Sequence, residues 1–311
     1  MITTHQKTVL LWFLLTLIFP TACGLNNNLT DTATNTPQIQ PTPELTLPPT
    51  RYLGQAQGFL LPNDATITRV WVPAGSFIMG SNDQRRDQKP AHEVYLDSYW
   101  LDQTEVTNQN FVDFLNEYPL LADWVQVNTA FSKIKSEADI FFTDAEDASY
   151  PVEAVAWYAA HKYCEWAGGR LPTEAEWEKG ARGTTEWLWP WGNTFETTKL
   201  NCSTIDCADD GFDQLAPVGS FPEGASPYNA FDMAGNVVEW TADIYDSKYY
   251  ESSPTKNPMN PLLPNSDDFG VLRGGSWLED RNTSYVTYRQ VADPRYLISG
   301  IGFRCVALPT N

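Results

Sequence analysis

The hydrophobic pattern divides the chain into three parts. An apolar run, VLLWFLLTLIF, occupies residues 9–19. A stretch dominated by Asn, Thr and Pro follows, with almost no large apolar side chain. Beyond it hydrophobic positions recur to the end of the chain, with neither a second linker nor a repeat of fixed period. We therefore expect a leader over 1–23, a polar tether over 24–65 and a folded domain over 66–309.

The leader has the pattern of an export signal. Lys7 precedes the apolar run, which is too short to span a bilayer comfortably. Thr21, Ala22 and Cys23 then resemble the end of a bacterial lipoprotein signal, where a small residue precedes the lipid-accepting cysteine, although Pro20 stands where an aliphatic residue is usual. We expect a signal peptide with Cys23 as the lipid acceptor. The alternative is ordinary cleavage, with Cys23 incidental.

The tether has too few apolar side chains to offset the entropy lost on ordering, so we expect it to be disordered. A signal, a lipid-accepting cysteine and a tether are typical of a protein held at a membrane surface by its anchor. The predicted location is the outer side of the bacterial cytoplasmic membrane, or the medium if the protein is secreted. Disulfides persist in such a location.

Short strands are predicted at the start of the folded domain. Residues 70–81, VWVPAGSFIMGS, favour two strands around a Pro-Ala-Gly-Ser turn. After His92 the buried positions alternate through Val94, Leu96 and Tyr99, which indicates a further strand.

Three helices are predicted downstream. Apolar residues at helical spacing, from Phe111 to Tyr118, indicate a first helix with Thr107 as its N-cap. A second helix is expected over 152–167. Thr173 and Glu176 form a capping box at the start of a third. The rest of the chain is rich in Gly, Pro, Asn and Asp, and its tryptophans argue against disorder, so we expect an irregular region organised by a ligand.

Charge and cysteine content limit the partners and the covalent framework. The 39 acidic and 20 basic side chains give a net charge of −19, which repels nucleic acid and favours cations. We therefore expect no nucleic-acid partner. With Cys23 set aside, four cysteines remain and permit three pairings that spacing does not distinguish. They are Cys164, Cys202, Cys207 and Cys305.

A series of sequence blocks extends in one order over roughly residues 68–308. The blocks are VPAGSFIMGS, DQTEVTNQNFVDFL, PVEAVAWYAAHKYCEWAGGRLPTEAEWEKGARG, WPWGN, APVGSFPEGASPYNAFDMAGNVVEW, RGGSW and GIGFRC. In this order they resemble the formylglycine-generating enzymes, or sulfatase-modifying factors. The resemblance implies an α+β, C-type-lectin-like fold with short strands, few helices and much irregular loop. Function within such a family is a separate question.

The resemblance also implies two structural Ca²⁺ sites. Carboxylates and backbone carbonyls are the hard oxygen ligands that Ca²⁺ prefers. The alternative is that these acids are solvated loop residues in an acidic protein. The first site would use Asp232, Gly235, Val237 and Glu239, and the second Asn201, Cys202, Asp210 and Phe212, with Cys202 and Phe212 acting through their carbonyl oxygens.

The cysteine pairing follows from the same resemblance. Cys164 and Cys305 stand where enzymes of higher organisms carry a disulfide between a helix and the final strand. Cys202 and Cys207 are then left, five residues apart. A local disulfide is the simplest account of them, and a soft-metal pair is the alternative.

The copper chemistry of the family is not expected in this chain. The aerobic enzymes hold Cu(I) with two cysteines placed as in GGSW-x-C-x4-C, and those positions here are Glu279 and Ser284. Because Cu(I) is soft, a carboxylate and a hydroxyl offer it little affinity, so we expect no copper. A branch with a three-histidine iron site is also excluded, since the folded domain has only His92 and His161.

Two hypotheses lead, and a third possibility, a purely scaffolding subunit, would predict a large exposed apolar patch instead of a pocket. Arg273, Ser276 and Trp277 would line the family's substrate groove, where a peptide, a protein or a small ligand could bind. The first hypothesis is a calcium-stabilised, membrane-tethered binding module. The second is an enzyme with altered chemistry, in which Glu279 acts as a general base with Ser276 or Ser284. A buried Glu279 in a deep pocket would favour the enzyme. The alternative for Arg273 and Trp277 is that they pack within the fold.

Overall fold

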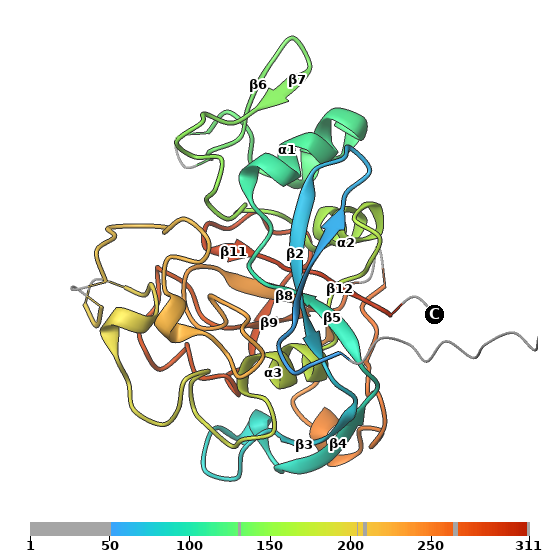
Figure 1. Ribbon diagram of the computed structural model, residues 1–311, viewed down its shortest axis with the longest axis vertical. Helices are drawn as coiled ribbons and strands as arrows, with labels where there is room; N and C mark the ends of the chain where they lie inside the picture. The colour runs from blue at the N-terminus through green and yellow to red at the C-terminus, as the bar shows by residue number, and fades with distance from the viewer. Residues whose placement is uncertain (1–50, 130–131, 204, 208–209, 264–266, 310–311) are drawn as a thin grey trace, which may run out of the picture. The chain divides into compact units, whose positions relative to one another are not determined.

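The computed structural model describes residues 51–129, 132–203, 205–207, 210–263 and 267–309 (Figure 1). The predicted signal peptide, Cys23 and the tether up to residue 50 lie outside these residues. Within them no helix is long and apolar enough to cross a bilayer.

Two small sheets and two hairpins form the β-structure. The order β1-β2-β5-β12 makes one antiparallel sheet. The order β10-β9-β8-β11 makes the other, in which only β11 runs parallel to its neighbour. The hairpins pair β3 with β4 and β6 with β7. The strands are β1 Ala56–Leu60, β2 Thr66–Val72, β3 Gly75–Met79, β4 His92–Leu96, β5 Tyr99–Asp102, β6 Lys135–Glu137, β7 Ile140–Phe142, β8 Val238–Ile244, β9 Gly270–Arg273, β10 Gln290–Ala292, β11 Ile301–Gly302 and β12 Val306–Ala307.

Few helices accompany these strands, so the α+β prediction of short strands, few helices and much irregular loop is confirmed. The α-helices are α1 Asn108–Glu117, α2 Trp157–Trp166 and α3 Glu174–Arg182. The short 3₁₀-helices are η1 Arg86–Gln88, η2 Pro119–Trp124, η3 Thr197–Lys199, η4 Pro222–Gly224 and η5 Tyr249–Glu251.

Both predicted N-caps are confirmed. The Thr107 side chain accepts a hydrogen bond from the Asn110 backbone at the start of α1. At α3 the capping box is complete, because Thr173 accepts from the Glu176 backbone and the Glu176 carboxylate accepts from the Thr173 backbone. Two donors that a helix end leaves free are thereby satisfied.

The predicted start of α2 at residue 152 is wrong. The Val152 backbone donates to Val106 and Val155 forms a bridge with Val125, so this segment is held extended. Ala154 has a positive φ of 54°, which no helix tolerates. The helix begins only at Trp157, after this extended segment has buried its valines.

The predicted end of the tether at residue 65 is also wrong. Residues 56–60 form β1, which pairs with β2 from Ala56↔Val70 to Leu60↔Thr66. The strand is mostly exposed and contains a glycine, so its sequence shows no hydrophobic alternation. The backbone ladder, rather than side-chain burial, brings this segment into the fold.

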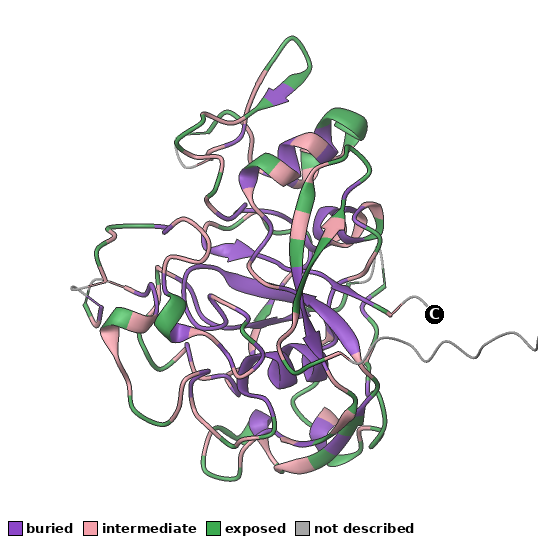
Figure 2. Cartoon of the chain, in the orientation of Figure 1, coloured by how far each residue is buried: buried purple, intermediate pink, exposed green. Residues whose placement is uncertain are grey.

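The core lies along β5, β8, β9 and α3, where nearly every residue is buried (Figure 2). The Cys164–Cys305 disulfide joins α2 to the segment before β12 across 141 residues of sequence. In the chain-entropy model, a disulfide that closes a loop of this length stabilises the fold by about 5 kcal/mol, because it lowers the entropy of the unfolded chain. The second expected disulfide, Cys202–Cys207, is also present.

Candidate functional site

The site is built on a buried network of charges below the RGGSW segment. Arg273, the last residue of β9, is fully buried and donates to Glu174 and to Glu178, at 2.6 Å each. Arg289 donates to both oxygens of Glu174, at 2.6 and 2.9 Å. Arg182 donates to the other oxygen of Glu178. The glutamates come from α3, so the network fixes β9 against that helix.

This network corrects one prediction. Arg273 was expected to line a substrate groove, but its guanidinium is enclosed by the carboxylates of α3. Burial alone would raise the pKa of Glu174, yet the charges of Arg289 and Arg273 hold that pKa below its ordinary value. Breaking such a buried pair leaves an uncompensated charge, so Arg273 is a structural residue.

The chain leaves β9 through two glycines that require a positive φ, 103° at Gly274 and 74° at Gly275. A Cβ on Gly275 would lie 3.1 Å from the backbone of Ser284. The segment carrying Ser276 therefore packs tightly against the segment carrying Ser284, which only glycine permits.

Glu279 is held beside Ser276. The Ser276 hydroxyl and the Gln290 amide, from β10, donate to the same carboxylate oxygen of Glu279, at 3.1 and 3.0 Å. Ser276 is buried and Glu279 is half-buried. The structure thus brings together Ser276 and Glu279, two of the predicted site residues.

Ser284 is separate from that pair. Its side chain is buried, and its hydroxyl donates to the Arg281 carbonyl at 2.9 Å and accepts from the Trp189 indole at 3.2 Å. In the part of the chain that the structure describes, no hydrogen bond joins Ser284 to Glu279. The two positions that hold copper in the family are therefore occupied by side chains engaged with different neighbours.

Trp277 is half-buried and points its indole at Glu153, 3.5 Å away. The same Glu153 oxygen accepts from the Gly300 backbone at 2.5 Å, and burial raises the pKa of Glu153. The next residue, Leu278, is half exposed, as is Val291 on the edge strand β10. Sequence reasoning missed Glu153, because nothing in the chain distinguishes it from the many other acids.

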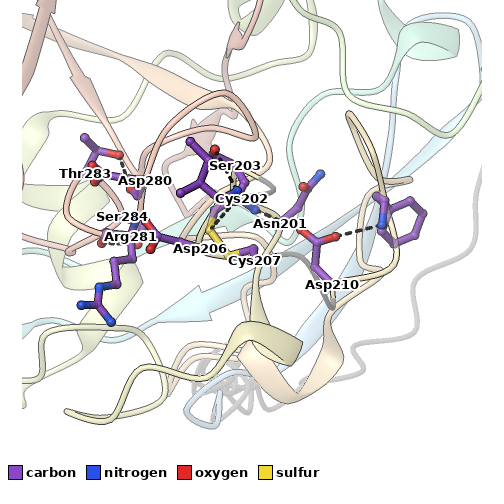
Figure 3. Close-up of a disulfide and its surroundings, with 12 residues drawn as sticks. Asn201, Cys202, Ser203, Asp206, Cys207, Asp210, Asp280, Arg281, Thr283 and Ser284 are labelled. Atoms are coloured by element: carbon purple, nitrogen blue, oxygen red, sulfur yellow. Dashed lines mark hydrogen bonds between the residues drawn. A yellow bond between two sulfur atoms is a disulfide. The ribbon is translucent and has the colours of Figure 1, made fainter.

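The Cys202–Cys207 disulfide supports this site from the side (Figure 3). The Ser203 backbone donates to the Glu279 carbonyl at 2.8 Å. The Asp206 carboxylate accepts from the Arg281 backbone at 3.2 Å. The disulfide loop therefore packs against the segment that carries Glu279 and Ser284 and is hydrogen-bonded to it.

The residues of the second predicted calcium site lie together beside that disulfide (Figure 3). The Asp210 carboxylate accepts from the Cys202 backbone at 3.3 Å and from the Phe212 backbone at 2.8 Å. The Asn201 amide donates to the Gln214 carbonyl at 2.8 Å. Burial raises the pKa of Asp210. Both carboxylate oxygens of Asp210 therefore already accept from backbone N–H groups of this loop, and Ca²⁺ would have to draw further oxygen ligands from nearby carbonyls.

The first predicted set adjoins the second, because Gly235 forms a bridge with Asn201. Both oxygens of Glu239 accept from Arg304, at 2.7 to 3.0 Å, and one also accepts from the Trp177 indole at 2.8 Å. The Asp232 carboxylate accepts from the Gly219 backbone at 2.6 Å. Both carboxylate oxygens of Glu239 are therefore already engaged by hydrogen bonds from other side chains.

A third carboxylate, Glu105, was missed by sequence reasoning. It is buried, and its Oε2 has no hydrogen-bond partner. Burial, and the charges of Asp232 and Glu239, raise its pKa against the opposing charge of Arg304. Three buried carboxyl groups thus lie near one guanidinium, and burial favours the neutral form of each, so a bound cation would be needed to keep all three ionised. No group of three or more His, Cys, Asp or Glu side chains among the described residues has metal-binding geometry, so backbone oxygens would have to complete the site.

Residues 61–308 match the model of the sulfatase-modifying factor enzyme 1-like domain. The formylglycine-generating enzyme of Mus musculus is 32% identical, with 80% of this chain and 78% of that protein aligned. The inactive C-alpha-formylglycine-generating enzyme 2 of Bos taurus is 31% identical, over 79% of this chain and 90% of that protein.

Two further similarities concern a larger protein and a solved structure. The serine/threonine-protein kinase pkn1 of Chlamydia caviae is 33% identical over 82% of this chain, and the match spans only 40% of that protein. PvdO from Pseudomonas aeruginosa superposes with a TM-score of 0.66 over 84% of this chain and all of its own, at 24% identity. At that identity the likeness shows the fold alone.

The network generates a prediction about pH. Burial and the charge of Glu174 raise the pKa of Asp243, on β8, to about 7. Its protonated form therefore stabilises the folded protein at low pH, and this contribution is lost as pH rises through 7. Between pH 5 and 8 we expect the free energy of unfolding to fall by on the order of 3 kcal/mol from this group, with most of the fall below pH 7.

Urea unfolding at a series of pH values tests this prediction. In the Asp243→Asn variant the free energy of unfolding should fall less steeply as pH rises, whatever the effect of the substitution on stability at pH 5. Asp267→Asn, at an exposed carboxyl, is the control and should leave the decline unchanged. An equally steep decline in Asp243→Asn would show that other groups cause it.

Proposed function

Because the chain belongs to the sulfatase-modifying factor family, we propose that it is a ligand- or peptide-binding module without copper-dependent formylglycine-generating activity. This proposal rests on the side chains found at the two positions that hold copper in the family's aerobic enzymes, Glu279 and Ser284. Glu279 accepts hydrogen bonds from Ser276 and Gln290, and Ser284 is buried and bound to Arg281 and Trp189.

Copper would have to displace these contacts and would gain only hard oxygen ligands in return. Cu(I) prefers thiolates. The four cysteines that the structure describes are all in disulfides, so none of them offers a thiolate. A relative of similar identity is itself named inactive, which supports the view that the scaffold persists without the oxidase.

The surface around Glu279 suits a bound polypeptide or small ligand. Trp277 and Leu278 offer apolar surface, and the partly exposed Glu279 carboxylate offers a charge and a free oxygen. A few polar groups among apolar side chains are typical of binding sites. A ligand with a cationic or hydroxyl group beside an apolar part would match this surface.

A second candidate is an enzyme with altered chemistry. The observation that favours it is the Ser276–Glu279 contact of 3.1 Å, which places a carboxylate within reach of a hydroxyl proton. In this version Glu279 takes a proton from Ser276 or from a bound substrate. Ser284 has no part in it, since its hydroxyl is engaged elsewhere.

The proposal includes export and a lipid anchor. Cys23 would carry the lipid, and the segment up to residue 50 would hold the domain away from the membrane surface. Two disulfides within the described residues accord with an oxidising compartment.

Calcium is proposed as a structural cofactor at the two sets described above. Asp210, with nearby backbone oxygens, would hold one ion, and Asp232, with backbone oxygens at Gly235 and Val237, would hold the other. In the second case the ion would favour the ionised forms of the buried carboxyl groups of Glu105, Asp232 and Glu239. Its role would be to fix irregular loops, which the backbone alone does not order.

The central part of the proposal is tested by mass spectrometry of a cysteine-containing sulfatase-motif peptide incubated with the protein, copper and oxygen. We expect an unchanged peptide mass, because no thiolate pair is available to bind copper. A formylglycine-generating enzyme serves as the positive control. Formation of formylglycine by this protein would contradict the proposal. A different modification, absent in the Glu279→Gln variant, would instead favour the altered enzyme.

Calcium dependence is tested by thermal unfolding with Ca²⁺ and with a chelator. Ca²⁺ at about one hundred times its Kd stabilises a folded protein by about 2.7 kcal/mol, so removal should lower the Tm by roughly 5–10 °C. Asp210→Asn should lose part of this shift. Asp206→Asn, in the adjacent Cys202–Cys207 loop, is the matched control, since its carboxylate accepts from the Arg281 backbone. Equal Tm values with and without Ca²⁺ would exclude the cofactor.

A further inference from the structure

A pocket of about 520 Å³ lies apart from the residues described above. Its walls are the turn around η1 and the loop that follows β8. The lining residues are Arg85, Arg86, Asp87, Tyr245, Ser247 and Lys248.

The pocket is cationic in a strongly acidic chain. Three basic side chains line it against the single carboxylate of Asp87, whereas the chain as a whole carries a net charge of −19. Arg86 and Lys248 are exposed, and neither has an ion pair with any other residue that the structure describes. Unpaired cations gathered in a concave site raise the local concentration of anions.

The walls are held in place by buried groups. The Arg289 guanidinium donates to the carbonyls of Asp87 and Asp246, at 2.9 and 3.0 Å, and so joins the two loops. The Tyr245 hydroxyl donates to Asp87 Oδ2 at 2.9 Å. Arg85 lies over the ring of Tyr288, 4.8 Å from its centre. A site fixed in this way loses little entropy when a ligand binds.

One of the lining residues, Asp87, has an unused acceptor. Asp87 is buried, and its Oδ1 has no hydrogen bond; its ion-pair contact with Nε of Arg85 is 3.4 Å long. A buried acceptor left without a donor is costly, and a ligand hydroxyl would satisfy it. The lining of the pocket therefore combines exposed cations with a buried hydroxyl acceptor.

We propose that this pocket binds an anionic carbohydrate, with the anionic group on Arg86 and Lys248 and a sugar hydroxyl on Asp87. The charge can come from a phosphate, a sulfate or a carboxylate, because a guanidinium and an ammonium bind each of these oxyanions. This binding goes beyond the function proposed for the Glu279 surface and does not depend on it.

The test is calorimetric titration of the purified protein at low salt with glucose 6-phosphate, glucose 6-sulfate and glucuronate. Glucose and inorganic phosphate are the comparators. We expect at least one anionic sugar to bind more tightly than either comparator, and the preferred sugar to identify the anionic group. Binding should weaken as salt is added.

The variant Arg86→Gln/Lys248→Gln removes the two exposed cations that have no ion pair among the described residues, without touching a buried group. It should weaken binding of the preferred sugar at least tenfold. The matched control, Lys162→Gln/Lys256→Gln, removes the same charge from side chains that do not line the pocket and should bind within twofold of the wild type. The proposal is overturned if no anionic sugar binds at millimolar concentration, if glucose or phosphate binds equally well, or if the two double variants behave alike.

Discussion

The mutual pairing of buried arginines and glutamates around α3 is the interaction on which the rest of the structure depends. Arg273 and Arg289 share Glu174, and Arg273 and Arg182 share Glu178. Removing these charges from water is costly, and their mutual pairing offsets that cost even though Nε of Arg273 and Nε of Arg182 have no hydrogen-bond partner in the part of the chain that the structure describes. The strand β9, the helix α3 and the segment around residue 289 are therefore held in one arrangement. Because the arginine of the RGGSW segment is a member of this network, the fold requires that segment whether or not it supports any chemistry.

Function can change on this scaffold without disturbing it. Glu279 and Ser284 lie outside the network, so replacing thiols at these positions alters the chemistry but leaves the pairing beneath them intact. The same network also reaches a second surface, because Arg289 binds the two loops around the cationic pocket. A rigid interior with adaptable loops above it is consistent with members of one family having different activities.

The sequence predicted features that depend on local chemistry. The caps at Thr107 and Thr173 follow from side chains that satisfy nearby backbone donors, and they were found correctly. The start of α2 was misplaced, because tertiary bridges hold Val152 and Val155 extended. Contacts between segments far apart in the chain were harder still to predict from the sequence. Arg273 was assigned to a groove, and Glu105 was missed, because their partners lie far away in the sequence.

The most direct test of the central claim, that the scaffold is retained without its copper site, is a competition titration of Cu(I) against a coloured chelator. We predict that the wild-type protein removes no Cu(I) from the chelator, because Glu279 and Ser284 supply no thiolate. The variant Glu279→Cys/Ser284→Cys should bind Cu(I), since β9 and its glycines still bring the two segments together. A wild-type protein that bound Cu(I) stoichiometrically would contradict the account.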